Sequence, residues 1–152
     1  MKRTCAVLAL IAALAPSAWV AWQGRDMPQL GLFHDDSLYW VCAKSLAEGG
    51  GYRILSLPEQ PHQTKYPPLY SLLLAGVWKL NPSFPGNLAM ATLMSWLWLP
   101  LCLLACQPVL AGLGLGRTHR LVATVLLALN PYVILYSVSL MSEVPFTCLL
   151  LG

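Results

Sequence analysis

The chain has 152 residues, of which 57% are hydrophobic and only 10% are charged, and its mean hydropathy is +0.62. A soluble domain carries roughly a quarter charged residues, so this composition excludes an ordinary soluble protein and predicts an integral membrane protein. The net charge of +3 is small and the basic residues are scattered, so we expect no nucleic-acid partner. The three histidines and five cysteines show no metal-ligand spacing, and no disulfide framework is expected.

The first segment reads as a membrane span. The chain opens with Lys2 and Arg3, and an apolar run over residues 5–22 follows. At about 1.5 Å per residue, this run is just long enough to cross the ~30 Å hydrocarbon core of a bilayer. The positive residues would hold the amino end in the cytoplasm. The alternative is a signal peptide cleaved near Ala18, and both interpretations place the following residues outside the cytoplasm.

Residues 23–65 form a long polar segment that holds nine of the fifteen charged residues. We expect a functional extracytoplasmic loop, because loops of this length without a structural role usually carry a function. Within it, the adjacent acids Asp35 and Asp36 begin an amphipathic helix, with Asp35 as N-cap and the glycines at 49–51 as the stop signal. One face of this helix is apolar at helical spacing, through Leu38, Tyr39, Cys42, Ala43 and Leu46. The competing interpretation is that both aspartates only cap the helix.

The rest of the chain is expected to form further helices. The paired prolines Pro67 and Pro68 can start a helix over residues 69–80, which at about 18 Å is too short to cross and therefore should lie on the outer membrane surface. The remaining expected segments are a second span at 88–110 with kinks at Pro100 and Pro108, a cytoplasmic turn at 112–120, a third span at 121–141 with a kink at Asn130-Pro131, and the start of a fourth at 144–152.

Glu143 follows the third expected span, so it is an isolated acid at the edge of the bilayer. An unpaired carboxylate is costly there, which makes Glu143 a functional candidate, although it can equally cap the next helix. With this topology Asp35, Asp36, Lys65 and Glu143 all fall at the outer surface. A carboxylate can take a proton from an attacking hydroxyl, and a lysine can neutralise a leaving phosphate, so the set suits chemistry on a phosphate-linked lipid.

The order of these features resembles a known family. The acidic pair is followed by Y-x3-A-x2-L-x2-G from Tyr39 to Gly49, then by K-Y-P-P-L-Y at 65–70, and then by a segment from Pro131 to Ser-Glu at 142–143. This order is similar to the amino-terminal part of the polyprenol-phosphate-sugar-dependent glycosyltransferases with the GT-C fold. They include the protein O-mannosyltransferases, the lipid A aminoarabinose transferases and the glycosyltransferase-39-like membrane proteins. The resemblance implies an all-α, polytopic membrane fold, of which this chain corresponds to the first part.

The resemblance also implies roles for single residues. Asp35 matches the catalytic base or acceptor-orienting carboxylate, and Asp36 matches the second acid of the pair. Lys65 matches the basic residue associated with the lipid phosphate, with Tyr66 intervening before the prolines, and Tyr39 is grouped with it as substrate-binding. Glu143 matches the acid of the second outer loop, which is sometimes associated with a divalent cation. No metal requirement is otherwise predicted.

The implied activity is transfer of a sugar from a polyprenyl-phosphate donor to a hydroxyl of a protein, lipid or glycan acceptor. We expect a multi-pass protein of the bacterial inner membrane, in contact with membrane lipid and with its active face outside the cytoplasm. Two alternatives stay open, a small non-enzymatic membrane protein and an inactive truncated remnant. A transporter is a weaker third option, because no acid or lysine lies in the middle of an expected span.

Overall fold

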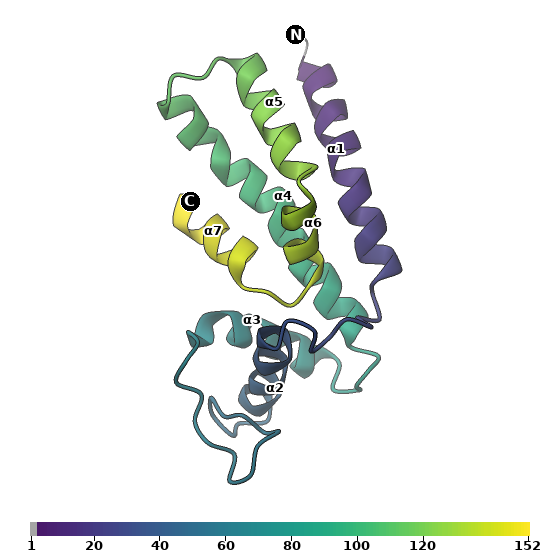
Figure 1. Cartoon of the computed structure of the whole chain (residues 1–152), viewed down its shortest axis with the longest axis vertical. Helices are drawn as coiled ribbons and strands as arrows, with labels where there is room; N and C mark the ends of the chain where they lie inside the picture. The colour runs from purple at the N-terminus through teal and green to yellow at the C-terminus, as the bar shows by residue number, and fades with distance from the viewer. Residues whose placement is uncertain (1–2) are drawn as a thin grey trace.

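The computed structural model describes residues 3–152, and these residues form α-helices and no β-strand (Figure 1). The all-α expectation is therefore confirmed for the described part of the chain. Lys2, one of the two residues expected to hold the amino end in the cytoplasm, lies outside the described residues. The helices are α1 (Arg3–Gln23), α2 (Asp35–Ala47), α3 (Pro68–Leu80), α4 (Leu88–Gly112), α5 (Arg117–Ala128), α6 (Pro131–Val138) and α7 (Glu143–Leu151).

Two helices are long and apolar enough to cross a membrane, at Thr4–Gln23 and Leu88–Gly112. The second of these runs unbroken through its two internal prolines. Helices α5 and α6 together would pass as a third span, but they meet at an angle of 59°. The break was expected at Asn130-Pro131 and lies there. The Asn130 side chain accepts hydrogen bonds from the first backbone N–H groups of α6, and Pro131 occupies the first turn, where its missing N–H costs nothing.

The helices divide into a bundle and a layer at one end of it (Figure 1). Helices α1, α4 and the α5–α6 pair lie side by side, and α7 packs against α4. Helices α2 and α3 pack on each other below the bundle, where the connection from α1 and the start of α4 meet them. We call α2 and α3 the end layer. Helix α3 begins one residue before the helix expected over 69–80 and ends with it.

An aromatic core holds the end layer together. The rings of Trp40 and Trp78 lie 4.7 Å apart, and the Trp78 indole donates to the Trp40 carbonyl at 3.3 Å. Such pairs contribute about 0.5–1.5 kcal/mol beyond the area that they bury. Leu88 at the start of α4 and Leu140 before α7 join this core, so the end layer is fixed to the bundle.

Helix α2 differs from the expectation at its N-terminus and agrees with it at its C-terminus. The N-cap is His34, with φ of 63°, and Asp35 is already the first helical residue, so the prediction of Asp35 as N-cap is wrong. The reason is that the Asp35 side chain turns toward Tyr66 rather than to the backbone of its own helix. The glycine stop is confirmed, because Gly49 has φ of +81° and the N–H groups of Gly49 and Gly50 bond to the carbonyls of Leu46 and Ser45.

Candidate functional site

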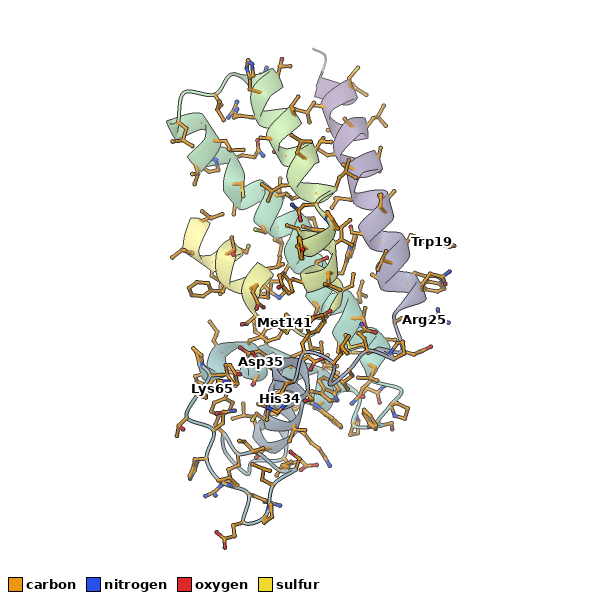
Figure 2. All side chains as sticks on the ribbon, in the orientation of Figure 1. Trp19, Arg25, His34, Asp35, Lys65 and Met141 are labelled. Carbon is orange, nitrogen blue, oxygen red and sulfur yellow. The ribbon has the colours of Figure 1, made fainter. Side chains whose placement is uncertain are left out.

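The candidate residues gather where the end layer meets the segment before α7. Figure 2 shows Asp35 on the side of the end layer that faces the bundle, just below Met141, and Lys65 at the left edge of the end layer. We call this place the interlayer site, and we define it by Asp35, Tyr39, Lys65, Tyr66, Ser142 and Glu143. Its residues come from the start of α2, the segment before α3 and the start of α7.

Asp35 is half-buried at the first position of α2, and the Tyr66 hydroxyl donates to its Oδ1 atom. Tyr66 stands directly before the two prolines that begin α3, and Pro67 is held in an extended conformation with φ of −61° and ψ of 141°. The stiff proline pair therefore fixes the place from which Tyr66 reaches Asp35. Oδ2 of Asp35 has no donor within residues 3–152, so one oxygen of the carboxylate is held and the other is available.

Asp36 lies in a different environment, with only 1% of its surface exposed. Its Oδ2 atom accepts from the backbone N–H of Gly31 at 2.9 Å, and its Oδ1 atom accepts from the N–H of Ser37 at 2.7 Å. Both oxygens therefore hold the loop before α2 against the first turn of that helix. This environment favours a structural role for Asp36, since both oxygens accept from backbone N–H groups and the side chain is buried.

Tyr39 connects α2 to the start of α7. Its hydroxyl lies 3.0 Å from the hydroxyl oxygen of Ser142, and its ring contacts those of Tyr66 and Tyr70 at centroid distances of 5.3 and 5.2 Å. Burial is the main cause that raises the pKa of Tyr39, and the negative charges of Glu143 and Asp35 raise it further. The Tyr39–Ser142 contact thus brings the start of α7 to α2, although the two helices are far apart in the sequence.

Lys65 is exposed at the edge of the site, with its ammonium nitrogen 4.7 Å from the centre of the Tyr66 ring. A cation in this position is attracted by the face of the ring. The pKa of Lys65 is raised above its ordinary value, first by the contact with Tyr66 and to a smaller extent by the negative charge of Asp35. The ammonium thus lies beside Tyr66, the residue that donates to Asp35.

Glu143 is the exposed first residue of α7. The residue before it, Ser142, has the N-cap position, but its side chain makes no capping hydrogen bond and interacts with Tyr39 instead. A carboxylate at the first helical position complements the positive end of the helix dipole, so Glu143 has a helix-stabilising role that is compatible with a chemical one.

An apolar cavity of about 200 Å³ opens next to Tyr39, between α3 and α7. Its walls contain Tyr39 and Ser142 from the interlayer site, Leu69 and Leu73 of α3, and Phe146 of α7. The site therefore has a charged side, formed by two carboxylates and an ammonium, and an apolar side, formed by the cavity. A ligand with a polar head and an apolar chain fits such a border.

Two residues of the site were missed from the sequence, Tyr66 and Ser142. Tyr66 was noted only as an intervening residue in the Lys-Tyr-Pro-Pro motif, yet it is in direct contact with Asp35. Its position before two prolines is a usable signal, because that backbone is stiff and presents the side chain in one direction. Ser142 has no comparable signal, since its partner Tyr39 is reached only through the tertiary fold.

Within residues 3–152, no group of three or more histidine, cysteine, aspartate or glutamate side chains gathers as a metal site. Comparison of the chain with protein-family models, with curated proteins and with solved structures gave no match. The functional argument therefore depends on the geometry of the interlayer site.

Proposed function

We propose that the chain belongs to an integral membrane glycosyltransferase that takes a sugar from a polyprenyl-phosphate donor on the extracytoplasmic face, as in a bacterial inner membrane. The observation that carries this proposal is that Asp35 and Lys65 both contact Tyr66, while Ser142, the neighbour of Glu143, contacts Tyr39 beside an apolar cavity. The motifs that resemble the GT-C glycosyltransferases specify four charged residues, and three of them, Asp35, Lys65 and Glu143, belong to the interlayer site, whereas Asp36 bonds to backbone N–H groups.

The reaction we propose is a single in-line displacement. Asp35 accepts the proton of the acceptor hydroxyl while that oxygen attacks the anomeric carbon, and the bond from this carbon to the phosphate oxygen breaks. Tyr66 holds one carboxylate oxygen, which leaves the other directed at the acceptor. The polyprenyl phosphate departs toward Lys65, whose charge stabilises it, and inversion at the anomeric carbon follows from the single step.

The test uses the full reading frame, expressed in membranes and incubated with radiolabelled polyprenyl-phosphate sugars. Asp35→Asn removes the base, so transfer should fall by about 10²-fold or more while the amount of protein in the membrane stays the same. Glu48→Gln is the matched control, because Glu48 is an exposed acid immediately after the same helix and should leave transfer unchanged. Full transfer by Asp35→Asn would show that Asp35 is not the base.

A non-enzymatic membrane protein is the second candidate, and Asp36 is the observation that favours it. Both of its oxygens hold backbone N–H groups, which shows that an acid of this segment can serve the fold alone. If Asp35 had the same kind of role through Tyr66, Asp35→Asn would lower thermal stability, and well-expressed wild type would transfer no sugar from any donor. The two candidates are therefore separated by the wild-type assay.

A further inference from the structure

A second cavity lies at the end of the bundle away from the end layer. It has a volume of about 440 Å³ and is formed by α1, α4 and α5. Arg117 and Arg120 of α5 line it, together with Gln107 of α4 and apolar side chains of α1 that include Val7 and Leu10. Nothing in the proposed glycosyl transfer uses this cavity, since the interlayer site is at the other end of the molecule (Figure 1).

The two arginines lie one turn apart on α5 and therefore share a face of the helix. The Nε atom of Arg120 is buried and has no hydrogen-bond partner within the described chain. A buried charged donor without a partner is costly, so the Nε–H group of Arg120 is available to donate a hydrogen bond to a ligand. The nearby Gln107 does not pair with it: its amide oxygen accepts no hydrogen bond from Arg120, and its amide nitrogen donates to the hydroxyl of Thr124 at 2.8 Å and to the Leu103 carbonyl at 3.1 Å.

No acid of this chain is available to neutralise the arginines. The sequence contains six acids, and none lies on α1, α4 or α5; they are Asp26, Asp35, Asp36, Glu48, Glu59 and Glu143. Helix α5 also begins at Arg117 with no acid in its first turn, so the positive end of its dipole adds to the same field. The cavity is thus a concave, positively charged site without an internal counter-ion.

The rest of the lining indicates which anion fits. The lining from α1 is apolar, with Ala6, Val7 and Leu10, whereas a site for a free ion is expected to be polar all round. Basic pockets between membrane helices are a known setting for the headgroups of anionic lipids. We propose that this cavity binds the phosphate of an anionic membrane lipid, with the phosphate at Arg117 and Arg120 and the acyl chains along α1.

The experiment measures binding of short-chain phosphatidylglycerol to the purified full chain in a neutral detergent. Short-chain phosphatidylcholine is the headgroup control, because it has the same phosphate but no net charge. We expect the anionic lipid to bind more tightly, and the Arg117→Gln/Arg120→Gln variant to weaken it by roughly 25-fold, at roughly fivefold per arginine. Arg53→Gln, which removes the same charge from the loop after α2, should leave the affinity unchanged.

Two outcomes would overturn the proposal. Equal affinity of the double variant and the wild type for phosphatidylglycerol would show that the arginines are not the site. Displacement of the lipid by inorganic phosphate at an equal concentration would identify a site for free phosphate instead. If the double variant does not fold, Arg117→Gln and Arg120→Lys are measured singly. Arg117→Gln should lower the affinity for phosphatidylglycerol by roughly fivefold. Arg120→Lys keeps the charge but loses the planar guanidinium, so it should bind the lipid more weakly than the wild type does. No sugar donor is present, so the result does not depend on glycosyl transfer.

Discussion

The two adjacent acids of α2 point to different partners, because successive residues of an α-helix are rotated by about 100° from each other. Asp35 meets the hydroxyl of Tyr66, while Asp36 turns back to the backbone of Gly31. A pair of acids in a sequence therefore does not predict a pair of acids in a site when the segment is helical. In this chain the carboxylate that acts on Tyr39 together with Asp35 is that of Glu143, from another helix.

Tyr70 gives a prediction about pH at the residue scale. Its hydroxyl is buried and lies 2.9 Å from the hydroxyl oxygen of Ser95, and burial strongly raises its pKa above the ordinary value of 10.0. Above that pH the unfolded chain loses the tyrosine proton before the folded chain does, so the unfolded state binds fewer protons. The free energy of unfolding should therefore fall as pH rises above about 10, by up to about 1.4 kcal/mol per pH unit for this group.

The measurement is the melting temperature in detergent between pH 8 and pH 11.5. Tyr70→Phe should lose about 0.5–1.5 kcal/mol at pH 8, because the hydrogen bond to Ser95 is gone, but its stability should fall less steeply above pH 10. Ser95→Ala is the matched control, since it removes the same hydrogen bond and keeps the titrating group, so its alkaline slope should stay as in the wild type. Equal slopes for Tyr70→Phe and wild type would contradict the prediction.

The candidate site was predictable from the sequence as a set of residues but not as a geometry. Asp35, Lys65 and Glu143 could be selected because charged side chains are rare and conspicuous in an apolar chain. The contacts among them depend on Tyr39 and Tyr66, which are ordinary aromatic residues until the end layer packs. Tyr39 was selected only through the family resemblance and Tyr66 was not selected, because their contacts with each other and with Asp35 and Ser142 form only when the end layer packs.

At the scale of elements, the residues that start or end a helix were the most accurate predictors. Proline starts α3 and α6, and glycine ends α2, because these residues restrict or permit backbone angles without help from the rest of the fold. The packing of α2 on α3 was not predicted, since it depends on Trp40 meeting Trp78. The third span expected at 121–141 had a kink at Asn130-Pro131, and at that place two helices meet at an angle of 59°.

Substitution of glycine by alanine is expected to change the stability in opposite directions at Gly49 and Gly76. Gly49 follows α2 with φ of +81°, a conformation that costs a residue with a Cβ atom about 1–2 kcal/mol. Gly76 lies inside α3, and a Cβ atom added there meets nothing within 4 Å. We expect Gly49→Ala to destabilise the chain by about 1 kcal/mol and Gly76→Ala to stabilise it by about 0.5–1 kcal/mol, measured by denaturant unfolding followed by circular dichroism. A loss of stability in Gly76→Ala would mean that α3 is more closely covered than this geometry indicates.

At the scale of the whole molecule, the acids are confined to one end of the bundle, whereas basic residues lie at both ends. All six acids lie in the segments around the end layer, whereas Arg117 and Arg120 lie at the opposite end without an acid nearby. Two long apolar helices, α1 and α4, connect these ends. Short segments that are rich in arginine tend to stay in the cytoplasm, so this division favours an orientation with the end layer outside the cytoplasm.

That orientation predicts which residues a reagent outside the cell can reach. The five natural cysteines are replaced by alanine, and a single cysteine is introduced by Ser56→Cys in the loop after α2 or by His119→Cys in α5, both at exposed positions. A maleimide that cannot cross membranes should label the Ser56→Cys variant in intact cells, and the His119→Cys variant only after the membrane is permeabilised. Labelling of both after permeabilisation controls for the reactivity of each thiol.

Labelling of the His119→Cys variant alone in intact cells would invert the topology and place the interlayer site in the cytoplasm, where the proposed donor orientation fails. Labelling of both in intact cells would show that the bundle does not separate its two ends across the bilayer.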